Sequence, residues 1–129
     1  DGVHLGRHDL PLAEVRRFVG DRFWIGCSTH FPEEAASACT QGADYCGVGA
    51  MFPTSTKAEV VSGPAYLRAY LQNFAAVPHL AIGGITPANL PQLLDEGVRG
   101  IAVSSVVCTS SDPGGVCREL RQILDARKA

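Results

Sequence analysis

Short, almost continuously apolar runs recur along the chain, and segments with helical periodicity separate them. The runs occupy residues 2–5, 23–27, 45–49, 79–82 and 100–103. Runs of this length and composition are typical of strands that are covered on both faces, as in a parallel sheet. This alternation is the strongest constraint that the sequence places on the fold.

The intervening segments carry the spacing and the end signals of amphipathic helices. They occupy residues 12–19, 33–41, 64–75, 87–96 and 113–127. Before the fourth of these, Thr86 suits the N-cap and Pro87 the first turn, and Gly97 suits the C-cap. Asp112 or Ser111 suits the N-cap of the last. Strands and helices that alternate at this spacing predict right-handed βαβ units and therefore a parallel sheet.

Two α/β architectures fit this alternation, an open doubly wound sheet and a (β/α)8 barrel. An open nucleotide-binding sheet usually carries a Gly-x-Gly-x-x-Gly loop after its first strand, and residues 6–9 read GRHD. Polar or glycine residues instead follow nearly every predicted strand, as in a barrel whose loops build the site. A whole barrel needs at least about 200 residues, and this chain has 129. We therefore predict a single domain over residues 1–129, a partial TIM (β/α)8 barrel of five β/α units.

The composition argues against several classes of protein. Hydrophobic residues make up 46% and charged residues 19%, which predicts a packed core rather than disorder. A formal net charge of -2 gives no reason to expect nucleic acid or an anionic membrane as a partner. The five cysteines form no Cys-x-x-Cys pair, so we expect neither zinc nor a structural disulfide, and a reducing, cytoplasmic location.

The last two predicted strands end in residues that suit a phosphate group. Gly83 and Gly84 let the backbone approach a ligand closely, because they carry no side chain. Ser104 and Ser105 follow the next strand with hydroxyls and backbone N–H groups. Barrels frequently bind a phosphate between the loops after their last two strands. We therefore favour a phosphate site here over two ordinary turns.

A second candidate is the loop that follows the third run. Thr54, Ser55 and Thr56 offer hydroxyl donors, and Lys57 offers a positive charge. These groups suit phosphate or diphosphate oxygens, but threonine, serine and lysine are equally ordinary in a solvated loop. Composition alone leaves the two interpretations balanced.

Single polar residues near other strands carry weaker signals. Asp9 follows the first run, where an aspartate more often caps the next helix than binds Mg²⁺. Ser28 and His30 follow the second run, and we expect His30 to be a surface residue. His4 and Trp24 lie within runs, so we expect both to be packing residues.

Five motifs, taken together, resemble those of thiamine phosphate synthases. They are GVHLGRHDLPL, IGCSTH, GADYCGVGAMFPTSTK, LAIGGITPANL and GVRGIAVSSVV, in the order and at the spacing of that family, and they span essentially the whole chain. The TSTK, GGIT and GVHLG elements are the most specific. The family forms a (β/α)8 barrel, and the resemblance implies that this chain corresponds to its units four to eight.

The resemblance implies a reaction and a role for each candidate residue. Hydroxymethylpyrimidine diphosphate would lose diphosphate with the help of Mg²⁺, and the nitrogen of thiazole phosphate carboxylate would capture the pyrimidine cation to give thiamine phosphate. Asp9 would bind the metal, and Ser28 and Lys57 would act as catalytic residues on the diphosphate. The residues implied at the thiazole phosphate are Thr54, Ser55, Thr56, Gly84, Ser104 and Ser105. The partners would be these phosphorylated small molecules, together with a second copy or an N-terminal barrel half.

Departures from the family pattern leave two alternatives open. Arg7 and His8 stand where the family usually has Gln and Glu, so Arg7 adds a positive charge near the metal. The family's first three units, with further diphosphate and metal ligands, have no counterpart among the motifs. One alternative is therefore a non-catalytic phosphate-binding remnant. The other is a thiazole tautomerase, although that family has a histidine at the position of Ala50.

Overall fold

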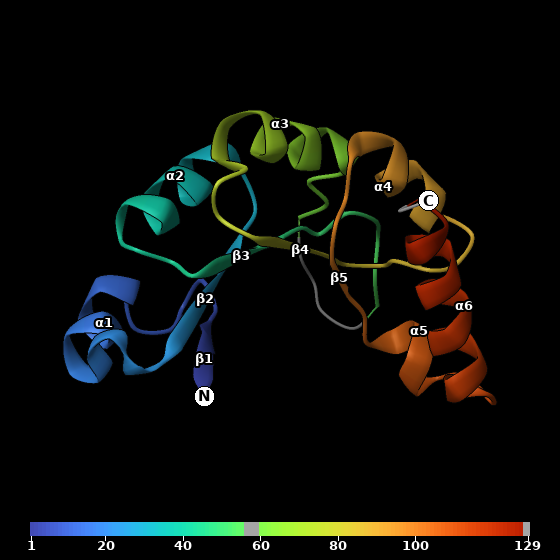
Figure 1. Cartoon of the computed structure of the whole chain (residues 1–129), viewed down its shortest axis with the longest axis horizontal. Helices are drawn as coiled ribbons and strands as arrows, with labels where there is room; N and C mark the ends of the chain where they lie inside the picture. The colour runs from blue at the N-terminus through green and yellow to red at the C-terminus, as the bar shows by residue number, and fades with distance from the viewer. Residues whose placement is uncertain (56–59, 128–129) are drawn as a thin grey trace.

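The computed structural model describes residues 1–55 and 60–127 of the chain. In this part, five parallel strands form one sheet in the order β1-β2-β3-β4-β5 (Figure 1). They are β1 (Gly2–Leu5), β2 (Trp24–Thr29), β3 (Tyr45–Val48), β4 (His79–Ile82) and β5 (Ile101–Ala102). The predicted α/β fold with a parallel sheet is confirmed, and each strand lies at its predicted apolar run.

The helices lie in an arc around the strands (Figure 1). They are α1 (Leu12–Val19), α2 (Pro32–Thr40), α3 (Pro64–Phe74), α4 (Leu90–Glu96), α5 (Ser105–Cys108) and α6 (Pro113–Ala126), with a 3₁₀ turn η1 (Gly20–Arg22) after α1. The short helix α5 was not predicted, because four residues are too few to show a helical period. All the other α-helices lie within predicted segments or extend them by one residue.

The start of α4 differs from its prediction. The α-helix begins at Leu90 rather than at Pro87. Its N-cap is Asn89 rather than the predicted Thr86. Thr86 instead holds the turn before the helix, because its hydroxyl accepts the N–H of Asn89 at 3.3 Å while the Asn89 side chain accepts the N–H of Thr86 at 2.8 Å. This reciprocal arrangement has the pattern of a capping box. At the other end, Gly97 takes the predicted left-handed conformation, with φ of 98°.

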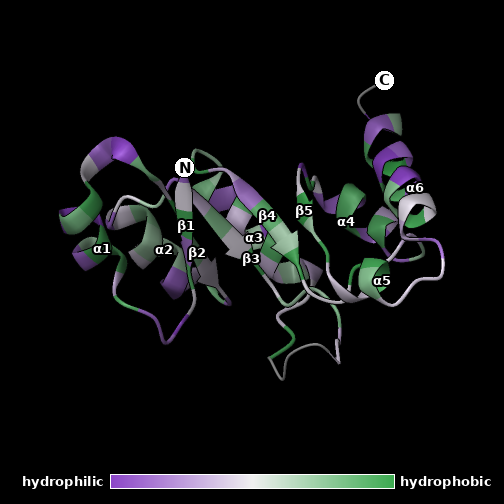
Figure 2. Ribbon diagram, turned by 90° about the horizontal axis from the view of Figure 1, so that it is seen from below, coloured by the Kyte–Doolittle hydropathy of each residue, from purple (hydrophilic) through white to green (hydrophobic). Residues whose placement is uncertain are grey.

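The hydrophobic core lies between the sheet and the helices. Ile25, Val48 and Ala81 contribute to it from three successive strands and are fully buried. The helices contribute the buried side chains of Leu67, Tyr70, Leu90 and Leu93. Figure 2 shows hydrophobic and hydrophilic residues alternating around α1 and α6, as expected of helices with one covered face. The five cysteines are free thiols.

The other face of the sheet carries the strand residues that alternate with the buried ones. Because successive side chains of a strand alternate between its faces, Trp24 points away from the side on which Ile25 is buried. Trp24 is 63% exposed, so the prediction that it packs in the interior is wrong for this chain. An apolar run does not reveal whether both of its faces are covered within the same chain.

The sheet ends at β1 and β5. Among the described residues, β1 pairs with β2 alone and β5 pairs with β4 alone. Within the same part of the chain, no helix is long and apolar enough to cross a bilayer.

Candidate functional site

A pocket of about 310 Å³ opens at the carboxyl ends of the strands. It brings together predicted residues from four successive strand ends: Ser28 in β2, Thr54 after β3, Gly84 after β4, and Ser104 and Ser105 after β5. The carboxyl ends of parallel strands share one edge of the sheet, so residues far apart in sequence converge there. The arrangement offers hydroxyl donors and close backbone approach around one small ligand.

The other predicted residues have different positions. Ser55 is exposed and does not line the pocket. Thr56 and Lys57 lie outside the described residues. Their assignment to phosphate or diphosphate therefore stays a prediction.

The loop after β4 is held from two sides. A Cβ atom on Gly84 would lie 2.5 Å from the carbonyl oxygen of Pro53, and Gly84 has φ of 64°. On the other side, the Asn89 side chain donates to the carbonyl of Gly84 at 2.9 Å. Backbone hydrogen bonds join the same loop to the segment after β3, from Met51 to Ile82 and from Phe52 to Gly83. Glycine is required here for both conformation and space.

His4 reaches the pocket, contrary to the prediction that it is a packing residue. Its side chain lines the pocket, where Nε2 lies 2.8 Å from Ser28 Oγ. Its Nδ1 atom lies 2.9 Å from the hydroxyl of Tyr45. Sequence reasoning missed this because the run GVHL is short and was treated as apolar on both faces. The alternation of side chains along β1 is the signal that would have placed His4 opposite to Leu5.

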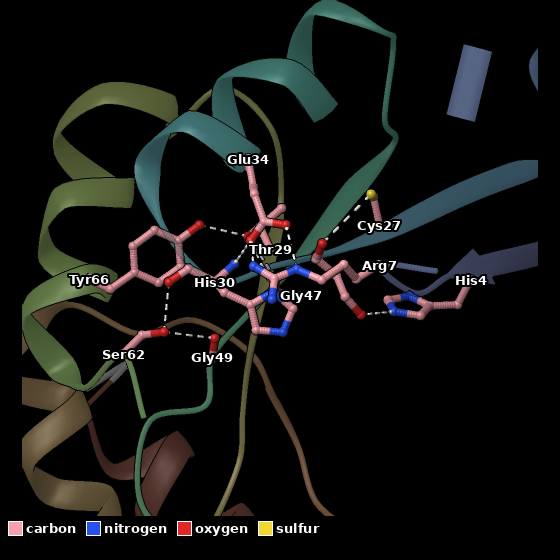
Figure 3. A network of polar contacts seen from close by, with 11 residues as sticks. His4, Arg7, Cys27, Thr29, His30, Glu34, Gly47, Gly49, Ser62 and Tyr66 are labelled. Atoms are coloured by element: carbon pink, nitrogen blue, oxygen red, sulfur yellow. Dashed lines mark hydrogen bonds and ion pairs between the residues drawn. The ribbon is translucent and has the colours of Figure 1, made fainter. Parts of the chain in front are cut away.

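His30 also differs from its prediction as a surface residue. Its side chain is 11% exposed and lines the pocket. One Glu34 oxygen accepts a hydrogen bond from the His30 backbone N–H at 3.1 Å. The same oxygen lies 3.0 Å from Nδ1 of His30 (Figure 3). Glu34 thereby joins the start of α2 to the end of β2.

Arg7 pairs with the same carboxylate. Two of its guanidinium nitrogens each lie 3.3 Å from one oxygen of Glu34 (Figure 3). The guanidinium carbon lies 5.6 Å from the centre of the Phe31 ring. The positive charge that Arg7 adds beside the predicted metal ligand is therefore offset by a neighbouring negative charge.

Asp9 does not cap the helix that follows it. The N-cap of α1 is Pro11, and Asp9 Oδ2 instead accepts the backbone N–H of Gly6 at 2.7 Å. Asp9 and Ser28 border a second hollow of about 280 Å³, beside the first. The described residues contain no group of three or more metal-binding side chains. A single carboxylate nevertheless fits Mg²⁺, which is commonly held by one or two carboxylates together with phosphate oxygens.

Buried hydrogen bonds support the pocket from the helix side. The Tyr66 hydroxyl donates to Thr29 Oγ1 at 2.7 Å, and Thr29 donates to the carbonyl of Gly47 at 2.8 Å. Ser62 Oγ lies 2.6 Å from the carbonyl of His30 and 3.0 Å from that of Gly49 (Figure 3). The ends of β2 and β3 are thus tied to α3 and the segment before it.

The fold and the site together define a class: an α/β protein of repeated strand–helix units with a small-ligand pocket at the carboxyl edge of a parallel sheet. The family of thiamine monophosphate synthases matches residues 1–107. The thiamine phosphate pyrophosphorylase of Pyrococcus furiosus superposes with a TM-score of 0.88 at 38% identity, over 98% of this chain and 60% of that one.

Curated relatives point to the same family. The chain is 43% identical to the thiamine-phosphate synthase of Halalkalibacterium halodurans, over 98% of this chain and 61% of that protein. It is 40% identical to the thiamine-phosphate synthase of Pelotomaculum thermopropionicum, over 99% of this chain and 59% of that protein. The chain therefore belongs to the thiamine monophosphate synthase family. It spans about three fifths of the length of these two relatives.

Proposed function

We propose that this chain is the C-terminal part, units four to eight, of a thiamine phosphate synthase barrel. The observation that carries the proposal is the single pocket in which Ser28, Thr54, Gly84, Ser104 and Ser105 meet. These residues come from the motifs that resemble the synthases, and the fold brings them to one place.

The reaction joins two phosphorylated substrates. The bond from the pyrimidine methylene carbon to the diphosphate oxygen breaks, and diphosphate leaves with the electron pair. The thiazole nitrogen supplies the electron pair for the new carbon–nitrogen bond. The bond between the thiazole ring and its carboxylate breaks and CO₂ leaves, because thiamine phosphate contains no carboxylate. The electron pair that remains on the ring takes up a proton from solvent. The largest electrostatic demand is the negative charge that develops on the departing diphosphate.

The pocket residues divide between the two substrates. Gly84, Ser104 and Ser105 would hold the thiazole phosphate with backbone N–H groups and hydroxyls, helped by Thr54. Ser28, which borders both hollows, would contact the pyrimidine diphosphate. Mg²⁺ bound at Asp9 would stabilise the charge on the diphosphate.

Two residues of this proposal, Thr56 and Lys57, lie outside the described residues. We assign Thr56 to the thiazole phosphate and Lys57 to the departing diphosphate on the resemblance of the TSTK motif.

Phosphate binding without catalysis is a second candidate function. The observation that favours it is that Gly84, Ser104 and Ser105 line one pocket, whereas Asp9 lines the second hollow. The first pocket could then hold a phosphate without any contribution from the metal ligand. Tautomerase activity has less support, because Ala50 is 1% exposed and carries no group that could transfer a proton.

The test combines binding with turnover. The chain is titrated with thiazole phosphate carboxylate by calorimetry, and thiamine phosphate formation is then measured with both substrates and Mg²⁺. Ser104→Ala and Ser105→Ala should each weaken thiazole phosphate binding by about five- to tenfold. Ser111→Ala is the matched control, because Ser111 is exposed and does not line the pocket.

The outcomes separate the two candidates. Turnover supports the synthase, whereas binding without turnover by folded protein supports the phosphate-binding remnant. A folded chain that binds no thiazole phosphate contradicts both.

A further inference from the structure

Ser28, His4 and Tyr45 form a chain of hydrogen bonds across three neighbouring strands. His4 on β1 lies 2.8 Å from Ser28 Oγ on β2 through Nε2, and 2.9 Å from the Tyr45 hydroxyl on β3 through Nδ1. The rings of His4 and Tyr45 also contact each other, with centroids 5.6 Å apart. Ser28 and His4 line the pocket, whereas Tyr45 lies behind them in an adjoining hollow.

Glycine makes this arrangement possible. A Cβ atom on Gly26 would lie 1.9 Å from Cζ of Tyr45, so the phenol ring occupies the space of a missing side chain. A Cβ atom on Gly47 would already touch His4, at 3.5 Å from Cε1. The two rings therefore lie directly on the backbone of β2 and β3, which limits their movement.

The chain of hydrogen bonds has a preferred direction. Burial raises the pKa of Tyr45, so the phenol keeps its proton near neutral pH. Within the described residues the partner of the phenol is Nδ1 of His4, and a phenol that donates there requires an Nδ1 atom without a proton. A neutral imidazole that accepts at Nδ1 carries its proton on Nε2, which then donates to Ser28 Oγ. The O–H of Ser28 is consequently directed to another acceptor.

We propose that Tyr45 and His4 are positioning residues that hold the Ser28 hydroxyl as a hydrogen-bond donor toward an anionic oxygen in the pocket. The inference rests on the proposed function, in which the anion at Ser28 is the diphosphate group. The direction matters: if Ser28 donated to His4 instead, the pocket would present an oxygen lone pair to the anion.

The first test is the position of the proton on His4. Histidine ¹⁵N NMR of the whole chain distinguishes an imidazole protonated at Nε2 from one protonated at Nδ1. We expect the Nε2–H form in the wild-type chain and loss of that preference in Tyr45→Phe. The matched control is Tyr70→Phe, which removes a phenol that donates to the carbonyl of Val77 instead. A wild-type His4 protonated at Nδ1, or one unchanged by Tyr45→Phe, overturns the proposal.

The second test measures binding of inorganic diphosphate in the presence of Mg²⁺. Ser28→Ala and Tyr45→Phe should each weaken binding by about five- to tenfold. The double variant should bind no more weakly than Ser28→Ala, because Tyr45 acts through Ser28. Losses that multiply in the double variant, or no diphosphate binding by the folded wild type, overturn the proposal.

Neither test requires turnover, so the two proposals can fail separately. A chain that shows the Nε2–H form and coupled diphosphate binding, yet makes no thiamine phosphate, contradicts the synthase and supports the positioning role. A chain that turns over but shows independent effects of Tyr45 and Ser28 contradicts only the positioning role.

Discussion

The guanidinium of Arg16 lies 2.7 Å from a carboxylate oxygen of Asp44, and the same oxygen accepts the backbone N–H of Ile25 at 2.8 Å. The hydrogen bond from Arg16, followed by that from Ile25, lowers the pKa of Asp44. Arg16 also donates to the carbonyls of Gly20, Phe23 and Gly42. These contacts tie the end of α1 to the starts of β2 and β3, at the end of the sheet opposite to the pocket.

Replacing Arg16 with Met should lower the free energy of unfolding by about 1 to 3 kcal/mol, because Asp44 and three carbonyls lose their donor. Arg17→Met is the control: Arg17 pairs with Glu14 at 2.9 Å, but the side chains are 75% and 50% exposed. That change should lower the free energy by less than about 1 kcal/mol. Urea denaturation measures both variants, and equal losses would show that Arg16 acts only as a surface charge.

Gly84→Ala should destabilise the chain more than Gly20→Ala does. The two glycines have similar φ angles, 64° and 61°, so an alanine at either position would have to adopt a positive φ. A Cβ atom on Gly84 would also lie 2.5 Å from the carbonyl oxygen of Pro53, whereas nothing lies within 4 Å at Gly20. We expect an additional loss of about 1 to 3 kcal/mol at Gly84. Thermal or urea unfolding measures both variants, and equal losses of stability in the two would contradict this prediction.

Tyr66 and Thr29 should be energetically coupled. Burial raises the pKa of Tyr66 to about 12, so its hydroxyl stays protonated and donates to Thr29 at 2.7 Å. Tyr66→Phe should lower the free energy of unfolding by about 1 kcal/mol. In a double-mutant cycle with Thr29→Val, the double variant should lose less unfolding free energy than the sum of the two single losses, by at least about 0.5 kcal/mol. Strict additivity would show that the hydrogen bond contributes nothing measurable.

Stability should depend on pH through His79. Burial, and then the charge of Arg99, lower the pKa of His79 in the folded chain. As pH falls below about 6.5, the unfolded chain binds a proton at this position before the folded chain does. The contribution of His79 is therefore present above that pH and is lost as pH falls toward the lowered folded pKa.

Urea denaturation between pH 5 and 8 would measure this effect, with the range set by the ordinary histidine pKa of about 6.5. His79→Gln should reduce the dependence of the unfolding free energy on pH. His8→Gln is the control, because His8 is exposed. An unchanged dependence in His79→Gln would refute the assignment.

Much of the fold could be predicted from the sequence because its signals are local. Apolar runs marked every strand, and Gly97 and Asp112 marked helix ends through contacts with nearby residues. The motifs after the strands also indicated which residues would meet, since parallel strands share their carboxyl edge. Helix α5 could not be predicted, because a single turn is too short to show the 3.6-residue spacing of apolar side chains.

The sequence by itself determined the order of strands and helices, their approximate ends, and that Ser28, Gly84, Ser104 and Ser105 lie together at the carboxyl edge. Periodicity and capping depend on residues a few positions apart, so both can be recognised directly in the sequence. Only the tertiary structure decided that Trp24 is exposed and that His4 bridges Ser28 and Tyr45. His4 and Tyr45 are 41 positions apart, and their contact depends on strand register and on the space above Gly26. Packing between segments that are distant in sequence sets the strand register and the space above Gly26. Neither can therefore be predicted from the residues next to His4 or Tyr45.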